Sequence, residues 1–235
     1  MKTIPLAKVP SPRPLSRRAL ERHLDDVRVP ARTAMLLGDL SSAGEAADRA
    51  ADLGVGAAVH DALGALVGHL SSGVDDGDPH EVHRNVGSLA GLGPGLTPTG
   101  DDILVALVAT SGRLADGGLL RRGAADRLAA AVAAIPEGRT TAVAHRLLSE
   151  TARGLYPEPL ASFVGALGDP TVDGEALAGL VARLTATGAH SGADWLAGAL
   201  ALARASVIQP RHSRPSLRAG LADAPGQGGD RWPSA

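Results

Sequence analysis

Hydroxyl and carboxylate side chains follow a run of glycines and prolines near the middle of the chain. The stretch 91–102 reads Gly-Leu-Gly-Pro-Gly-Leu-Thr-Pro-Thr-Gly-Asp-Asp and leads directly into the apolar residues 103–109. Because glycine permits close backbone approach and proline fixes φ, we expect a rigid loop followed by a helix. Thr99 is predicted to be the N-cap, with Asp102 as an acidic variant of the capping box. This helix start would bring hydroxyls, carboxylates and N–H groups to one place.

A second copy of the pattern occurs ninety-two residues later, at Ser191-Gly192-Ala193-Asp194. Both copies read hydroxyl, glycine, any residue and aspartate, followed by two apolar residues. One interpretation is that both are ordinary helix caps. The other is that two helix N-termini, each with a partial positive charge, converge on one small anion such as a carboxylate or phosphate.

Two neighbouring segments could contribute to the same site. Arg139 precedes Thr140 and Thr141 at a third predicted helix start, and an arginine can bind a carboxylate or phosphate with two hydrogen bonds. His190 directly precedes the second copy, where it could be a polar site residue or an acid–base group.

The carboxylates of the two copies would repel a bare anion, so the site needs a counter-charge. A bridging Mg²⁺ ion held by Asp101 and Asp102 would supply it, and no other cofactor is indicated. We assign catalytic roles to Asp101, Asp102 and Asp194, which would hold the metal or orient the hydroxyls. The amides of Gly100 and Gly192 would stabilise developing negative charge. The predicted substrate-binding residues are Gly93, Gly95, Thr97, Thr99, Gly100, Arg139, Thr140, Thr141, His190, Ser191 and Gly192.

Several common kinds of site are excluded. A short helix, not a strand, is predicted before the glycines, which argues against a dinucleotide fold, and a P-loop would need a lysine that is absent. The chain has no cysteine, which excludes thiolate chemistry and is typical of a cytoplasmic protein. Residues 33–205 are acidic and the chain is 2 % aromatic, so we expect no nucleic-acid partner. No apolar run approaches the roughly 20 residues of a membrane span.

Alanine and leucine dominate the apolar residues, which favours helices. No segment shows the alternation that is typical of a strand. The fold prediction is mainly α, a single compact multi-helix domain over residues 15–205, with a flexible Pro-rich N-terminus (1–14) and a disordered basic tail (206–235). A Gly/Pro-rich loop lies at a helix N-terminus of this domain. Helices are predicted over 17–27, 32–70 with a division at Gly54 and Gly56, 80–89, 100–114, 119–135, 140–154, 157–167, 175–185 and 191–205.

The ten residues 93–102 resemble the sequence motif of the AllH-like family. That motif ends in Ser-Gly-Asp-Asp where this chain has Thr99-Gly100-Asp101-Asp102. The segments 139–141 and 188–194 also resemble family segments and occur in the same order, so the resemblance spans about residues 85–205.

The resemblance implies a subunit of oxamate carbamoyltransferase, an assembly of allantoin breakdown. That assembly converts oxalurate and phosphate to oxamate and carbamoyl phosphate. A small anionic substrate, partner subunits and a cytoplasmic location follow from it, with no membrane partner. The alternative is a non-catalytic helical scaffold or ligand-sensing subunit. The proximity of Thr99 to Ser191 distinguishes a two-part site from two unrelated helix starts.

Overall fold

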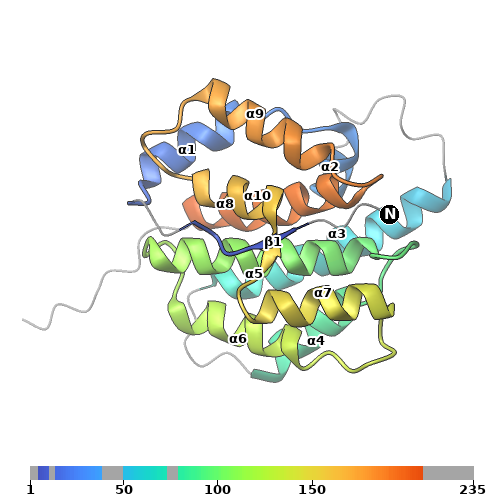
Figure 1. Cartoon of the computed structure of the whole chain (residues 1–235). Coiled ribbons are helices and arrows are strands. Elements are labelled where there is room, and N and C mark those ends of the chain that lie inside the picture. The colour runs from blue at the N-terminus through green and yellow to red at the C-terminus, as the bar shows by residue number, and fades with distance from the viewer. Residues whose placement is uncertain (1–4, 11–13, 39–49, 73–78, 209–235) are drawn as a thin grey trace, which may run out of the picture.

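Ten helices make up most of the computed structural model in the part of the chain that it describes, residues 5–10, 14–38, 50–72 and 79–208 (Figure 1). The prediction of a mainly α fold is confirmed. Most of the predicted basic tail, 209–235, lies outside the described residues. The helices are α1 (Arg17–Asp26), α2 (Ala31–Leu36), α3 (Ala50–Ser71), α4 (Pro79–Leu89), α5 (Thr99–Asp116), α6 (Arg122–Ala133), α7 (Ala142–Ala152), α8 (Glu158–Ala166), α9 (Gly174–Thr185) and α10 (Ser191–Ile208).

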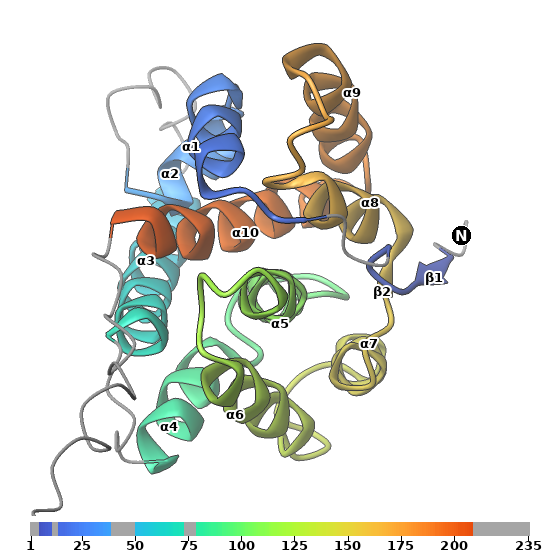
Figure 2. The ribbon, with the colours of Figure 1, turned by 90° about the vertical axis from the view of Figure 1, so that its left-hand side faces the viewer.

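The helices α5 and α10 form the centre of the molecule. Residues 103–109 of α5 are apolar on every side of the helix and all are buried, as expected for a helix enclosed by other helices. Figure 2 looks along α5 and shows α10 crossing it. A Cβ added at Gly198 of α10 would lie 2.9 Å from the carbonyl oxygen of Ile103, so glycine is what lets the two backbones approach.

Two groups of helices cover this central pair. The helices α1, α2 and α9 pack against α10, and α6 and α7 pack against α5, with α4 beside α6 (Figures 1 and 2). The helix α3 contacts α10, α2 and α4.

Hydroxyl side chains cap two of the predicted helices, and one predicted helix break is wrong. Ser16 caps α1 by accepting the N–H of Ala19 at 3.3 Å, and Thr141 caps α7. The helix α3 continues through Gly54 and Gly56 where a division was predicted. A Cβ added at Gly56 would lie 3.1 Å from Cε of Met35, so this glycine permits close packing against α2.

The N-terminal segment contributes a two-residue strand that the sequence did not predict. β1 (Leu6–Ala7) pairs antiparallel with β2 (Tyr156–Pro157), in which Leu6 faces Pro157. Two residues are too few to show an alternating pattern. Pro157, predicted within the first turn of α8, instead precedes that helix as its N-cap. Among the described helices, none is long and apolar enough to cross a membrane.

Candidate functional site

The first turns of α5 and α10 lie side by side. The hydroxyl oxygens of Thr97 and Ser191 are 3.1 Å apart and share a hydrogen bond. The two copies of the sequence pattern, far apart along the chain, therefore meet in the fold. The contact involves Thr97 in place of Thr99, and Thr99 itself is joined to Asp194 of the second copy through Arg32.

The predicted capping role of Thr99 is wrong, because α5 already includes this residue. Pro98 is the N-cap, and its carbonyl accepts the N–H groups of Asp101 and Asp102 at 2.9 and 3.1 Å. The extended backbone of Pro98, with φ −54° and ψ 147°, turns the chain directly into the helix. His190 plays the same part before α10, where its carbonyl accepts the N–H of Asp194 at 3.0 Å. The hydroxyls of the two helix starts are thus available for contacts between helices.

Packing explains the glycine in each copy. A Cβ added at Gly100 would lie 1.9 Å from the carbonyl oxygen of Leu89, at the end of α4, and one at Gly192 would lie 2.0 Å from that of Leu184, near the end of α9. No side chain fits at either position unless the backbone moves.

The amides of the same two glycines already have acceptors within the chain. The N–H of Gly100 donates to the carbonyl of Leu92 at 2.9 Å, and that of Gly192 donates to the carbonyl of Thr187 at 3.0 Å. The expected use of these two amides as oxyanion donors is therefore corrected, because both are engaged in holding the helix starts.

A pocket of about 360 Å³ opens beside the paired helix starts. We call it the first-turn pocket. Residues of α2, α3, the Gly/Pro loop and the start of α10 line it. Gly95 of the loop, at φ +106°, lies in its wall. Its polar wall is formed by Arg32, Thr97, Thr99, His190, Ser191 and Asp194. All of these except Arg32 were predicted site residues.

Arg32 joins the two helix starts across this pocket. Its Nε donates to Oδ1 of Asp194 at 2.6 Å, and its Nη2 donates to Oδ2 of Asp194 at 3.1 Å and to the hydroxyl of Thr99 at 2.9 Å. A guanidinium held by both carboxylate oxygens is fixed in orientation. Its Nη1 makes no hydrogen bond to a described residue and can donate to a ligand. No sequence pattern indicated this residue, since Arg32 is distant from every motif.

Asp102 lies behind the hydroxyls of Thr97 and Ser191. Unlike Asp194, it forms no ion pair with an arginine among the described residues. It is 1 % exposed, and the indole N–H of Trp195 donates to its Oδ1 at 2.9 Å. No described residue makes a hydrogen bond to its Oδ2. Burial raises the pKa of Asp102 to about 7, aided by the negative charge of Asp194 and opposed by the hydroxyls of Ser191 and Thr97 and by Trp195. This carboxyl group can therefore hold or release a proton near neutral pH.

Asp101 points to a different part of the molecule. It accepts the backbone N–H of Gly91 at 3.0 Å through Oδ1 and the hydroxyl of Thr140 through Oδ2. Burial raises its pKa, and the hydrogen bonds from Thr140 and Gly91 and the charge of Arg139 oppose the rise. Asp101 thus ties the loop and α5 to the segment before α7.

Three other predicted residues contact the loop or α4 and do not line the first-turn pocket. Thr141 accepts the N–H of Ala144 at 3.1 Å and donates its hydroxyl to the carbonyl of Leu96. Arg139 donates to the carbonyl of Gly87 at 2.6 Å. Gly93, at φ +110°, packs so closely that an added Cβ would be 3.0 Å from the nitrogen of Thr99.

The predicted Mg²⁺ site does not fit the arrangement of its two carboxylates. Both oxygens of Asp101 accept hydrogen bonds from the protein, while Asp102 faces Trp195 on another side of the helix. Across the described ranges, no three His, Asp or Glu side chains gather in a group that could hold a metal ion.

Comparison with known proteins supports the predicted resemblance. Residues 89–203 match the model of the family described as oxamate carbamoyltransferase subunit AllH. No curated protein and no solved structure matches the chain. The matched segment contains both helix starts but not Arg32. Residues 89–203, just under half of the chain, therefore resemble the AllH family.

Proposed function

We propose that the chain is a subunit of an oxamate carbamoyltransferase-like complex and binds a small carboxylate substrate in the first-turn pocket. One observation carries the proposal: Arg32 and the hydroxyls of Thr97, Thr99 and Ser191 converge there from separate segments. The name of the family supports the role as one subunit among others. A cytoplasmic location is part of the same proposal.

The charges of the pocket favour a singly charged substrate. Asp194 neutralises Arg32, whereas the two helix N-termini each add a partial positive charge. A carboxylate could bind Nη1 of Arg32, and the hydroxyls of Thr97 and Ser191 could contact an uncharged carbamoyl or amide end. Oxamate and oxalurate combine such a carboxylate with such an end, so they suit the pocket better than a phosphate dianion.

The proposed reaction needs a group that moves one proton. A phosphate oxygen bonds to the carbamoyl carbon of oxalurate, and the bond from that carbon to the oxamate nitrogen breaks. The proton that leaves phosphate ends on this nitrogen. Asp102, whose pKa is about 7, suits the transfer and would act through the hydroxyls of Thr97 and Ser191 that separate it from the pocket. Asp194 would position Arg32, and Asp101 would hold the loop.

Calorimetry of the full chain with oxamate, oxalurate and carbamoyl phosphate tests the proposal. We expect Arg32→Met to weaken binding of oxamate at least tenfold, whereas Arg28→Met, an exposed arginine before the same helix, leaves it unchanged. Since Arg32→Met leaves Asp194 without its cation, the double variant Arg32→Met/Asp194→Asn separates lost binding from lost stability. Folded wild-type protein that binds none of the three compounds, alone or with partner subunits, would contradict the proposal.

A non-catalytic ligand-sensing or scaffold subunit is the second candidate. The observation that favours it is that the Gly100 and Gly192 amides are bonded within the protein, so these two amides do not serve as oxyanion donors. An assembled complex that binds oxamate through Arg32 but keeps its full rate with Asp102→Asn would exclude Asp102 from catalysis and favour this second function.

A further inference from the structure

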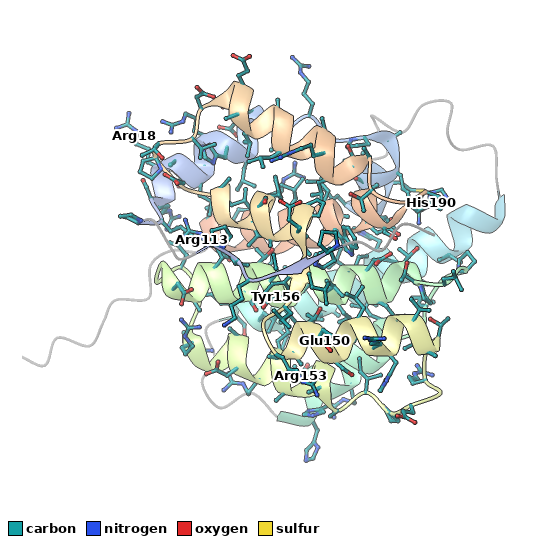
Figure 3. All side chains as sticks on the ribbon, in the orientation of Figure 1. Arg18, Arg113, Glu150, Arg153, Tyr156 and His190 are labelled. Carbon is teal, nitrogen blue, oxygen red and sulfur yellow. The ribbon has the colours of Figure 1, made fainter. Side chains whose placement is uncertain are left out.

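A second hollow lies toward the other end of α5. It encloses about 330 Å³, and we call it the strap hollow because residues 8–10, which follow β1, form one wall. The C-terminal half of α5 and the segment from α7 to β2 form the others. Arg113 in its wall is fourteen residues after Thr99 on α5, or about 21 Å along the helix. In Figure 3, Arg113 and Tyr156 lie near β1, whereas His190 lies toward the opposite end of the view.

Three cationic side chains from separate segments line the strap hollow. They are Lys8 beside β1, Arg113 of α5 and Arg153 after α7. The one carboxylate in the lining, Asp116, forms an ion pair with Arg122 outside the hollow. The lining therefore holds three cations and one carboxylate; Arg153 also pairs with Glu150 at 3.4 Å, and the charge of Asp116 still acts on Arg113 and Tyr156.

Arg113 is the most deeply placed of the three cations. It is 3 % exposed, and its Nη2 donates to the carbonyl of Leu167 at 3.3 Å. Burial lowers its pKa, while the charges of Asp169 and Asp116 raise it. An anion in the hollow would add to these charges in a poorly solvated place, where electrostatic attraction is strong.

Tyr156 adds a hydrogen-bond donor to the same wall. Burial and the charge of Asp116 raise its pKa, so the phenol keeps its proton at neutral pH. Its hydroxyl makes no hydrogen bond to a described residue. The pairing of β1 with β2, in which Ala7 faces Tyr156, brings Lys8 to the same place.

We propose that the strap hollow is a binding site for a tetrahedral oxyanion, either free phosphate or the phosphate group of a larger molecule. Lys8 and Arg153 supply charge at the opening, Arg113 supplies charge at the base, and Tyr156 donates a hydrogen bond. Phosphate and arginine suit each other because the planar guanidinium can donate two parallel hydrogen bonds. The site is separate from the first-turn pocket, and the proposal does not depend on the function assigned there.

The single tyrosine of the chain provides a reporter for this hollow. Full-length protein labelled with 3-fluorotyrosine gives one ¹⁹F resonance, from position 156. We expect inorganic phosphate to shift this resonance saturably, whereas chloride at equal ionic strength does not. A second titration with ADP identifies the source of the anion: saturation by ADP at lower concentration points to a phosphate carried by a nucleotide, and saturation by phosphate alone points to the free ion.

Variants of exposed residues make the assignment specific. The side chain of Arg153 is 71 % exposed and Lys8 is exposed, so Lys8→Ala/Arg153→Ala should fold normally, which circular dichroism verifies. We expect it to weaken phosphate binding at least tenfold. Arg146→Ala, an exposed arginine of α7 outside the hollow, and Arg32→Met should each leave the titration unchanged. Absence of a saturable shift with either anion, or an equal shift in the double variant, would overturn the proposal.

Discussion

Asp102 and Asp194 are equally buried carboxylates with different electrostatic surroundings. Asp194 binds the guanidinium of Arg32 through both oxygens, whereas Asp102 accepts a hydrogen bond from neutral Trp195. A buried carboxylate without a cation is costly in its charged form, so Asp102 is the one that favours a proton. The two residues should therefore respond differently to pH and to substitution.

The stability of the protein should fall as pH rises because of Asp102. Its pKa is about 7 in the folded chain and 3.8 as an unperturbed group, so the native state holds a proton that the unfolded state has lost between these values. The free energy of unfolding then decreases with rising pH across this window, with a slope approaching about 1.4 kcal/mol per pH unit.

Asp102→Asn should remove the contribution of Asp102 to the pH dependence of the free energy of unfolding. The variant should also be more stable than wild type at pH 8. Urea unfolding at several pH values from 4 to 8 measures both effects. The raised pKa of Asp101 contributes with the same sign in both proteins, so the difference between their curves isolates Asp102. Parallel stability curves for the two proteins would contradict the prediction.

Removing Arg32 should cost more stability than removing an exposed arginine. Arg32→Met leaves the carboxylate of Asp194, 2 % exposed, without its cation, and we expect a loss of about 3 kcal/mol. Asp194→Asn in the same chain should recover part of that loss. Arg122→Met, which breaks the exposed pair with Asp116, should cost less than about 1 kcal/mol. Chemical denaturation of the four proteins compares them, and equal losses for Arg32→Met and Arg122→Met would show that the buried pair is unimportant.

At the scale of elements, the N-termini of α5 and α10 are held by the same two kinds of contact. Each begins after a residue whose carbonyl accepts the first-turn amides, and each carries a glycine packed on the carbonyl of a leucine in the preceding helix. The repeat in the sequence thus reflects two helix–loop–helix joints that are built alike. The two joints meet where the hydroxyl of Thr97, in the Gly/Pro loop, contacts that of Ser191, in the first turn of α10.

Alanine at either glycine should destabilise the protein, although alanine usually favours helix. The added Cβ would lie 1.9 Å from a carbonyl oxygen in Gly100→Ala and 2.0 Å in Gly192→Ala, so backbone must move. We expect a loss of about 3 kcal/mol or more for each. Gly112→Ala, also in α5 but with nothing within 4 Å of the added Cβ, should gain about 0.5–1 kcal/mol. Thermal unfolding measures all three, and stabilisation by Gly100→Ala would show that the helix start is loosely packed.

The sequence predicted these joints better than it predicted their chemistry. The Gly/Pro loop and the two matching helix starts were found because glycine, proline and capping residues act locally. The role predicted for Gly100, an amide that stabilises negative charge, was wrong. This glycine packs on the carbonyl of Leu89, and that contact depends on how α4 folds back against α5. Arg32 was missed because the side chain that completes a site can come from any helix, and only packing shows which one.

At the scale of the molecule, the segment that matches the AllH family lacks several of the helices that pack against it. Residues 89–203 contain α4 only at its last residue and lack α1, α2 and α3 entirely. Yet α1, α2 and α3 all pack against α10, and α2 supplies both Arg32 and the hydroxyl of Thr33, which donates to the carbonyl of Ala193 at 2.9 Å. The first-turn pocket is therefore built jointly by the matched segment and the N-terminal helices.

The matched segment alone should not form the native core. A fragment of residues 89–203 would expose the face of α10 that α1, α2 and α3 cover, and Asp194 would lose its cation. Since most of the free energy of folding comes from buried apolar area, we expect helical far-ultraviolet circular dichroism without a cooperative unfolding transition, and binding of a hydrophobic dye. The full chain is the matched comparison and should unfold cooperatively. Cooperative unfolding of the fragment, with retained oxamate binding, would show that the N-terminal helices contribute to neither the core nor the pocket. A fragment that neither unfolds cooperatively nor binds oxamate would show that the family motif needs the N-terminal helices to form both the core and the first-turn pocket.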